Sequence, residues 1–171
     1  RDELLVCMLG TGCAVPSKHR APAAIYLHAF SRGGVLLDAG EGTLGQLSTL
    51  FGPAAAALAL QRLRAVFISH HHADHHLGLL CLLSAVTALR SSSAPPLLVV
   101  GPRAVGTFLT TYANLSASSS RPPRLRFAFE PCTAINSPRS LGRDWLLRGS
   151  GLGLTSIRAV PVVHCHAAWG F

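Results

Sequence analysis

The sequence predicts a single layered α/β domain, and three observations support this prediction. Strand-like segments come first and follow one another closely, strand-like and helix-like segments then alternate, and about half of the residues are apolar. Adjacent strands favour an antiparallel start to the sheet, and the later alternation favours helices packed on its faces. The chain has 171 residues, of which 49% are hydrophobic, enough to bury a core.

The first half of the chain is expected to hold three strands and then two helices. The strands are expected at residues 4–9, 23–30 and 35–38, separated by a loop with Gly, Pro and Lys and by a Ser-Arg-Gly-Gly turn. We expect these three strands to form an antiparallel sheet. Helices are expected at 44–50, which glycines bound, and at 54–63, which is rich in alanine.

The second half begins with a β-loop-α unit. A strand at 65–68 leads into a histidine-rich loop and then into an apolar helix at 75–89. The segments after it are less strongly patterned, apart from a helix with proline in its first turn. The expected segments are a strand at 97–100, this helix at 102–115, an exposed loop at 116–123, a strand at 125–129, a loop at 137–151 and an extended segment at 152–163.

Composition and charge narrow the function classes. The formal net charge is +8, from 15 basic and 7 acidic residues, which favours polyanionic partners. Five cysteines without a CxxC pair indicate a reducing, intracellular compartment. Because no apolar run reaches about 18 residues, we expect no membrane span. Both ends are expected to be cuts through a larger protein, since each lies close to a strand-like segment.

The most informative segment is the loop that follows the strand at 65–68. Five of the nine histidines fall within residues 70–76, in the order His-x-His-x-Asp-His. Imidazole and carboxylate are ligands of zinc. An extended chain brings His70, His72 and Asp74 to one side, and the following helix fixes His75. One ion would take His70 and His72, and its neighbour would take Asp74 and His75.

A simpler interpretation of this run is a purification tag or a low-complexity metal-binding tract. Tags lie at chain ends, whereas this run lies between a strand and a helix. His71 and His76 alternate away from the ligand set, and we leave them outside it.

Three successive segments resemble the signatures of tRNase Z, the tRNA 3′-processing zinc phosphodiesterase family of the metallo-β-lactamase superfamily. They are MLGTGCAVPSKHR at 8–20, LDAGEGTLGQL at 37–47 and FISHHHADHHLGL at 67–79. The resemblance is strongest to the start of the C-terminal catalytic half of the long eukaryotic form. It implies the αββα sandwich of the metallo-β-lactamase fold, with residues 1–171 forming its N-terminal portion as one truncated domain.

The resemblance also implies an activity and its setting. It predicts a zinc-dependent endoribonuclease that removes the 3′ trailer from precursor tRNA, with two zinc ions in the complete domain. Long-form members act in the nucleus and the mitochondrion, and a homodimer is compatible with the family. The late metal ligands of the family follow the point that matches residue 171, so the 171 residues alone are expected to be inactive.

Roles for individual residues follow from the same resemblance. His70 and His72 would hold the first zinc together with His164, which precedes a glycine by six residues as in the family pattern. Asp74 and His75 would hold the second zinc, and Asp74 is also the expected proton acceptor.

Two further parts of the motifs have expected roles in binding and positioning. Lys18 and Arg20 match a family loop associated with tRNA handling, although Ala21 stands where the family has asparagine. Asp38 is expected to orient a ligand histidine or the loop backbone rather than to act in catalysis.

Two alternatives to this function stay open at the level of the sequence. One is another hydrolase of the superfamily, of the thioesterase or lactamase type, because the metal motif is shared among them. The other is a non-catalytic, truncated copy that binds zinc or RNA without cutting.

Overall fold

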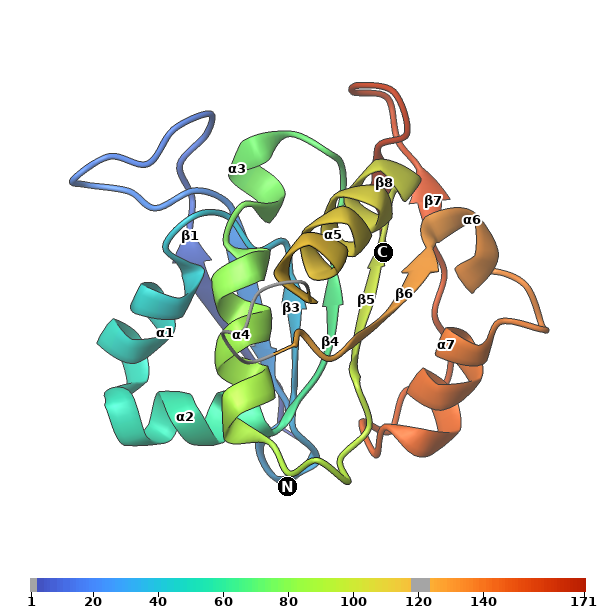
Figure 1. The fold of residues 1–171 in the computed structure, drawn as a ribbon, viewed down its shortest axis with the longest axis horizontal. Coiled ribbons are helices and arrows are strands. Elements are labelled where there is room, and N and C mark those ends of the chain that lie inside the picture. Colours follow the sequence, from blue (N-terminus) through green and yellow to red (C-terminus); the bar gives the residue numbers. More distant parts are fainter. Residues whose placement is uncertain (1–2, 118–123) are drawn as a thin grey trace.

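The computed structural model describes residues 3–117 and 124–171 and places a six-stranded sheet at the centre of the molecule (Figure 1). The strands lie in sequence order, with the first three antiparallel and the next ones parallel from β3 to β6. The α/β prediction and the antiparallel start are therefore confirmed. The strands are β1 (Leu5–Gly10), β2 (Ala24–His28), β3 (Gly34–Leu37), β4 (Leu63–Phe67), β5 (Leu97–Gly101) and β6 (Phe127–Pro131).

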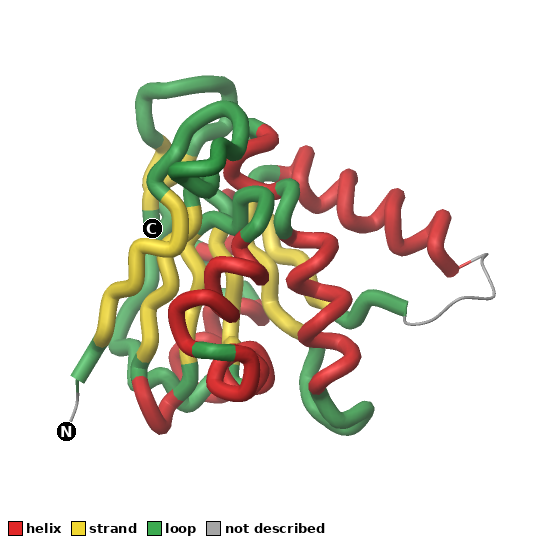
Figure 2. The backbone as a smooth tube through the Cα atoms, turned by 90° about the vertical axis from the view of Figure 1, so that its left-hand side faces the viewer, coloured by secondary structure: helices red, strands yellow, loops and turns green. Residues whose placement is uncertain are grey.

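Helices cover both faces of the sheet (Figures 1 and 2). The larger group packs on one face and consists of α1 (Thr43–Phe51), α2 (Pro53–Gln61), α4 (Leu79–Leu89) and α5 (Arg103–Ala117). The other face is covered by α6 (Cys132–Ile135), α7 (Leu141–Asp144) and a π-helical turn at Trp145–Gly149. A short 3₁₀ turn at Phe30–Arg32 joins β2 to β3.

The alternation of side chains along the central strands explains the two layers of core. In β4, Val66 belongs to the core under α1, α2 and α4, whereas its neighbours Ala65 and Phe67 belong to the core under α6 and the π-helical turn. All three are buried. Parallel strands covered on both faces are apolar on both faces, which is why this segment looks continuously hydrophobic in the sequence.

The loops that carry the predicted site gather at one end of the sheet, at the top of Figures 1 and 2. The β1–β2 loop projects there, beside the short helix α3 (Ala73–His76) that follows β4. The hairpin of β7 (Val160–Pro161) and β8 (Trp169–Gly170) rises at the same end. Carboxyl ends of parallel strands meet at one edge, where ligand sites of open α/β sheets are found.

The prediction of a single apolar helix at 75–89 is wrong, because the chain forms α3 and α4 with a break at Gly78. Glycine has low helix propensity, and here the Gly78 amide donates to the Ala39 carbonyl oxygen at 2.9 Å. The break allows the backbone to pack directly against the end of β3. The apolar pattern of α4 continues into α3 in the sequence and so conceals this break.

The prediction of a loop at 137–151 is also wrong, since α7 and the π-helical turn lie within this range. Ser140 begins this helical segment by accepting a hydrogen bond from the Arg143 amide at 2.9 Å, a capping signal of the kind that starts helices. The segment expected to be extended at 152–163 forms strand only at β7. Of the loop expected at 116–123, the first two residues continue α5 and residues 118–123 lie outside the described part.

Over residues 3–117 and 124–171, no helix has both the length and the apolar character that crossing a bilayer requires.

Candidate metal centre

The site begins with Asp38, which follows β3 at the edge where β4 also ends. Its backbone is left-handed, with φ of 60°, a conformation that non-glycine residues seldom adopt. The carboxylate accepts hydrogen bonds from the Ser69 amide at 2.8 Å and from the Ser69 hydroxyl at 2.9 Å. It also contacts His75 Nδ1 at 2.7 Å. Asp38 therefore fixes both the start of the histidine loop and one ring within it.

The pairing with Asp38 fixes the orientation of His75. Hydrogen bonding to the Asp38 carboxylate raises the pKa of His75, with burial acting in the opposite direction and Asp74 adding to the increase. Because Nδ1 is engaged by Asp38, Nε2 is the nitrogen left to face the site, an arrangement typical of metal-binding histidines.

An Asp38→Asn variant tests this role, because it keeps the shape of the side chain and removes its charge. In the metal-free protein we expect the pKa of His75, followed by NMR of the ring protons, to fall. We expect zinc affinity, measured by competition with a chromophoric chelator, to drop by about 10- to 100-fold, as for other residues that orient metal ligands. An unchanged His75 pKa in this variant would show that the Asp38 carboxylate does not pair with the His75 ring.

Three of the predicted ligands come together from distant parts of the chain. His70 Nε2 lies 3.0 Å from His72 Nδ1. The ring of His164 stands 4.6 Å from that of His70 and 5.3 Å from that of His72, measured between centroids. The hairpin of β7 and β8 places His164 there, because the Trp169 amide donates to the Ser69 carbonyl oxygen at 2.9 Å.

Cys165 is a member of this cluster that the sequence interpretation missed. The potential ligand atoms of His70, His72, His164 and Cys165 all lie within 4.8 Å of one another. Its position directly after His164 is the signal that could have indicated it. The lack of a CxxC pair gives no information about a single cysteine beside a ligand histidine.

Asp74 and His75 form a second pair next to this cluster. His75 Nε2 lies 3.6 Å from Asp74 Oδ2, and the rings of His70 and His75 are 4.0 Å apart. Asp74 Oδ2 also accepts a hydrogen bond from the Ala14 amide at 2.8 Å, which ties the β1–β2 loop to α3. Burial raises the pKa of Asp74, but the Ala14 amide and the nearby His75 outweigh it, so the pKa lies below its ordinary value.

Comparison with known proteins gives the family. A model described as the beta-lactamase superfamily domain matches residues 34–168. The chain belongs to the beta-lactamase superfamily. The resemblance to tRNase Z is confirmed as well: "tRNAse Z TRZ4, mitochondrial" of Arabidopsis thaliana is 35% identical over 99% of this chain and 22% of its own length. "Ribonuclease Z, mitochondrial" of Drosophila melanogaster is 34% identical over 96% of this chain and 20% of its own.

Solved structures also match the fold. A long form RNase Z from yeast has a TM-score of 0.83 at 22% identity and covers 98% of this chain and 26% of its own. The short form of human tRNase Z has a TM-score of 0.58 at 31% identity, covering 74% and 44%. The chain spans about a fifth of the length of the first curated relatives it matches.

The donor set of the cluster fits zinc, as expected for this superfamily. Three imidazoles and a thiol are the groups that bind zinc in proteins, and a relative from Macaca fascicularis, 46% identical over 64% of this chain, is named "Zinc phosphodiesterase ELAC protein 2". Two nitrogens on one tetrahedral zinc lie about 3.3 Å apart. The 3.0 Å between the nitrogens of His70 and His72 is close to this spacing.

Electrostatics favour the ligating form of the central histidine. His70 is buried, and this burial together with His75, His72 and His164 lowers its pKa to about 4. The ring is therefore neutral at physiological pH, which is the form that binds a metal.

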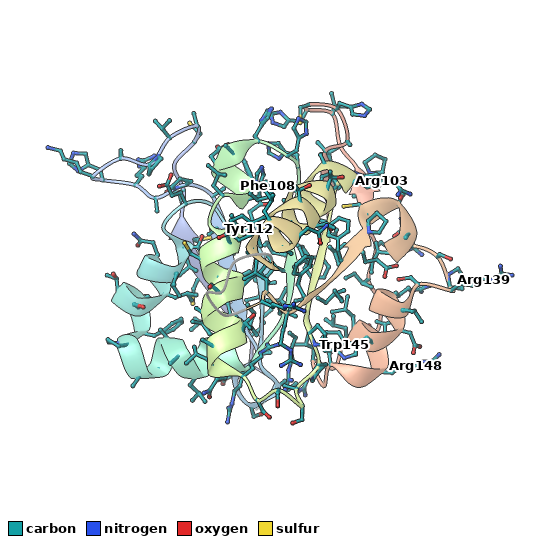
Figure 3. The ribbon with its side chains drawn as sticks, viewed as in Figure 1. Arg103, Phe108, Tyr112, Arg139, Trp145 and Arg148 are labelled. Carbon is teal, nitrogen blue, oxygen red and sulfur yellow. The ribbon has the colours of Figure 1, made fainter. Side chains whose placement is uncertain are left out.

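Three histidines adjacent in sequence to the proposed ligands, His71, His76 and His166, lie outside the ligand cluster. His71 and His166 are exposed. The ring of His76 lies 5.3 Å from the ring of Phe108 of α5, between centroids, with the two planes tilted by 55°. Figure 3 shows Phe108 on the side of α5 facing α3. His76 Nε2 also lies 3.1 Å from the carbonyl oxygen of His71, so this ring is held by contacts within the protein.

Lys18 and Arg20 lie apart from the metal cluster, in the exposed loop between β1 and β2. The Gly12 amide donates to the Ala21 carbonyl oxygen at 2.8 Å and closes the loop at its base. Ser17 Oγ accepts a hydrogen bond from the Arg20 amide at 3.1 Å and shapes the tip. Lys18 and Arg20 therefore lie in an exposed loop that internal hydrogen bonds hold in shape. Ala14 of the same loop donates its amide hydrogen bond to Asp74.

Proposed function

We propose that the protein is a zinc-dependent endoribonuclease that removes the 3′ trailer from precursor tRNA. The observation that carries this proposal is the match to proteins named tRNase Z over 99% of the chain. The convergence of His70, His72 and His164 at the end of the sheet supports it. We also propose that the protein forms a homodimer. We further propose that it acts in the mitochondrion, which the names of relatives support, and in the nucleus.

The ligand pairs favour two zinc ions. His70, His72 and His164 would hold one, and Asp74 with His75 would contribute to the other. When bound, a zinc pair would lower the pKa of a bound water to about 7 and would neutralise charge that develops on a phosphate. The neutral ring of His70 and the anionic carboxylate of Asp74 are the protonation states that this binding needs.

Asp74 is the residue proposed to take the proton of the attacking water. Its carboxylate is one-tenth exposed and is held by the Ala14 amide, so one oxygen is fixed while the group stays ionised. A positioned carboxylate within hydrogen-bond reach of the water is what general base catalysis requires.

Lys18 and Arg20 are proposed to touch the RNA backbone, and their replacement gives a salt-dependent prediction. The Lys18→Ala/Arg20→Ala variant should bind precursor tRNA more weakly. For every phosphate that the variant no longer neutralises, the slope of log affinity against log salt should fall by about 0.7 to 0.9. Filter binding at several salt concentrations measures both effects.

Arg139 and Arg148 provide the matched control, because their replacement removes the same net charge at another place. Both project from the side of the molecule formed by α7 and the segment around it, away from the β1–β2 loop (Figure 3). An Arg139→Ala/Arg148→Ala variant should keep the wild-type salt slope. Equal decreases in affinity and slope for the two variants would mean that only net charge matters and would reject the specific role of Lys18 and Arg20.

A cleavage assay tests the activity itself. The resemblance places two further metal ligands after the point that matches residue 171. The assay therefore uses a chimera in which residues 1–171 replace the matching segment of the yeast long form RNase Z. We expect this chimera to release the trailer from an end-labelled precursor tRNA, leaving a 3′-hydroxyl on the tRNA. A zinc-loaded chimera that binds tRNA but does not cut it, or that turns over a thioester instead, would contradict the proposal.

A further inference from the structure

We propose that a groove beside the metal centre binds the single-stranded 3′ trailer of the precursor RNA. This inference rests on the proposed function and adds a binding site for one part of its substrate. Two hollows, of about 360 and 420 Å³, share Arg103 and Pro131 and together form the α5 groove. The inner hollow lies between the hairpin of β7 and β8 and the first turns of α5 and α6, and the outer hollow lies between α5 and β6.

The inner hollow is built from the same two segments that carry the histidine ligands. His71 lines it and lies in the chain between His70 and His72. His166 also lines it and follows His164 by two residues. An RNA strand whose phosphate lies at the ligand cluster therefore has its neighbouring nucleotide at the mouth of this hollow.

Trp169 gives the inner hollow a surface on which a base can stack. It packs against the core under α6 and the π-helical turn and also lines the hollow, so its ring is held in place while part of it stays accessible. Stacking on an aromatic ring accepts any base. The volume of about 360 Å³ is that of a small-molecule site, about 300–1,000 Å³, so the hollow admits a single nucleoside and excludes a double helix.

The side chains along the groove suit a phosphate backbone. Arg103 is exposed at the start of α5 (Figure 3) and belongs to both hollows. Thr110 and Thr111 line the outer hollow, and hydroxyl groups of this kind bind phosphate oxygens. Among the described residues that line the two hollows, none is acidic. The nearby Glu130 is engaged elsewhere, since its carboxylate accepts a hydrogen bond from the Gly142 amide at 3.1 Å.

The position of the groove relative to the β1–β2 loop assigns it to the trailer. Figure 1 shows this loop on one side of α3, and the hairpin of β7 and β8 with α6 on the other side. The loop carries Lys18 and Arg20, which are proposed to contact the RNA, and it resembles a loop associated with tRNA handling. With the tRNA on that side, the strand that continues past the scissile phosphate toward the α5 groove is the trailer.

Binding of two RNAs to the chimera tests the groove. The RNAs are a precursor tRNA and the same tRNA without its trailer, and zinc is removed so that the precursor stays intact. We expect the unsubstituted chimera to bind the precursor more tightly. Arg103→Ala should weaken binding of the precursor alone and reduce its salt slope by about 0.7, the value for one phosphate contact on a single strand. Arg139→Ala is the matched control, because Arg139 is another exposed arginine that projects away from the groove (Figure 3), and it should bind both RNAs as the unsubstituted chimera does.

Tryptophan fluorescence of the 171-residue chain tests the contact with Trp169. The chain has two tryptophans, so Trp145→Phe leaves Trp169 as the reporter. We expect a short single-stranded RNA with a 5′-phosphate to quench this emission, because a base stacks on the indole ring. A double-stranded RNA of the same length should not quench it. Adding Arg103→Ala should shift the quenching to higher RNA concentrations.

The outcomes separate this inference from the proposed function. Equal affinity of Arg103→Ala and the unsubstituted chimera for the precursor, or emission of Trp169 that single-stranded RNA leaves unchanged, would overturn the groove, and a chimera that still cleaves would keep the nuclease. Equal losses of affinity for both RNAs in Arg103→Ala would place Arg103 on the tRNA itself and overturn the assignment to the trailer. A chimera that binds the trailer through Arg103 and does not cleave would reject the nuclease and leave the groove as an RNA-binding site.

Discussion

Replacing His70 with alanine is expected to abolish metal binding and trailer cleavage together. His70 is the centre of the site, with the rings of His72, His75 and His164 at 4.6, 4.0 and 4.6 Å. Loss of a residue that only orients a ligand costs about 10- to 100-fold in metal affinity, so loss of this ligand should exceed the upper end of that range. Isothermal titration with Zn²⁺ and the chimeric cleavage assay measure the two effects.

His71→Ala is the control for this experiment, because His71 is adjacent in sequence and exposed. It should leave zinc affinity within a few-fold of wild type, and circular dichroism should show that both variants are folded. Full zinc affinity in His70→Ala would contradict the central place given to this ring.

Replacing Gly78 with alanine is expected to cause a large loss of stability. A Cβ at this position would overlap the carbonyl oxygens of Gly40 and Ala39, which are backbone atoms that cannot move aside. Overpacking of this kind costs about 3 kcal/mol at the upper end of its usual range. The same overlap would push α3 away from the end of β3 and displace Asp74 and His75.

Gly45→Ala is the matched glycine control. Gly45 lies on α1, and a Cβ there would meet nothing within 4 Å, so the change should stabilise the helix by about 1 kcal/mol. Urea unfolding followed by circular dichroism compares the two variants. A Gly78→Ala protein with a wild-type unfolding midpoint would show that the close approach of α3 to the end of β3 is not needed.

The sheet was predictable because its signals are local. Each of its strands overlaps an expected segment, since strand and turn patterns are contained within a few residues. The break at Gly78 was not predictable in this way, because the close approach to Gly40 depends on how two distant segments pack. Helix α7 was missed because its capping serine lies among glycines, serines and arginines that also favour loops.

The candidate site divides in the same way into local and distant parts. The residues from His70 to His75 are adjacent in the sequence, so the strand and helix around them were enough to suggest their convergence. His164 lies almost a hundred residues away and reaches them through the hydrogen bond of Trp169 to Ser69. The pattern of the sequence does not encode that tertiary interaction, so only the resemblance to a family indicated His164, and nothing indicated Cys165.

The most direct test of the central claim is anomalous X-ray diffraction at the zinc edge from crystals of the zinc-loaded protein. We predict one strong peak surrounded by His70, His72 and His164, with a second between Asp74 and His75. A map whose peaks lie elsewhere on the molecule, or that has none beside His70, would contradict the proposed metal centre.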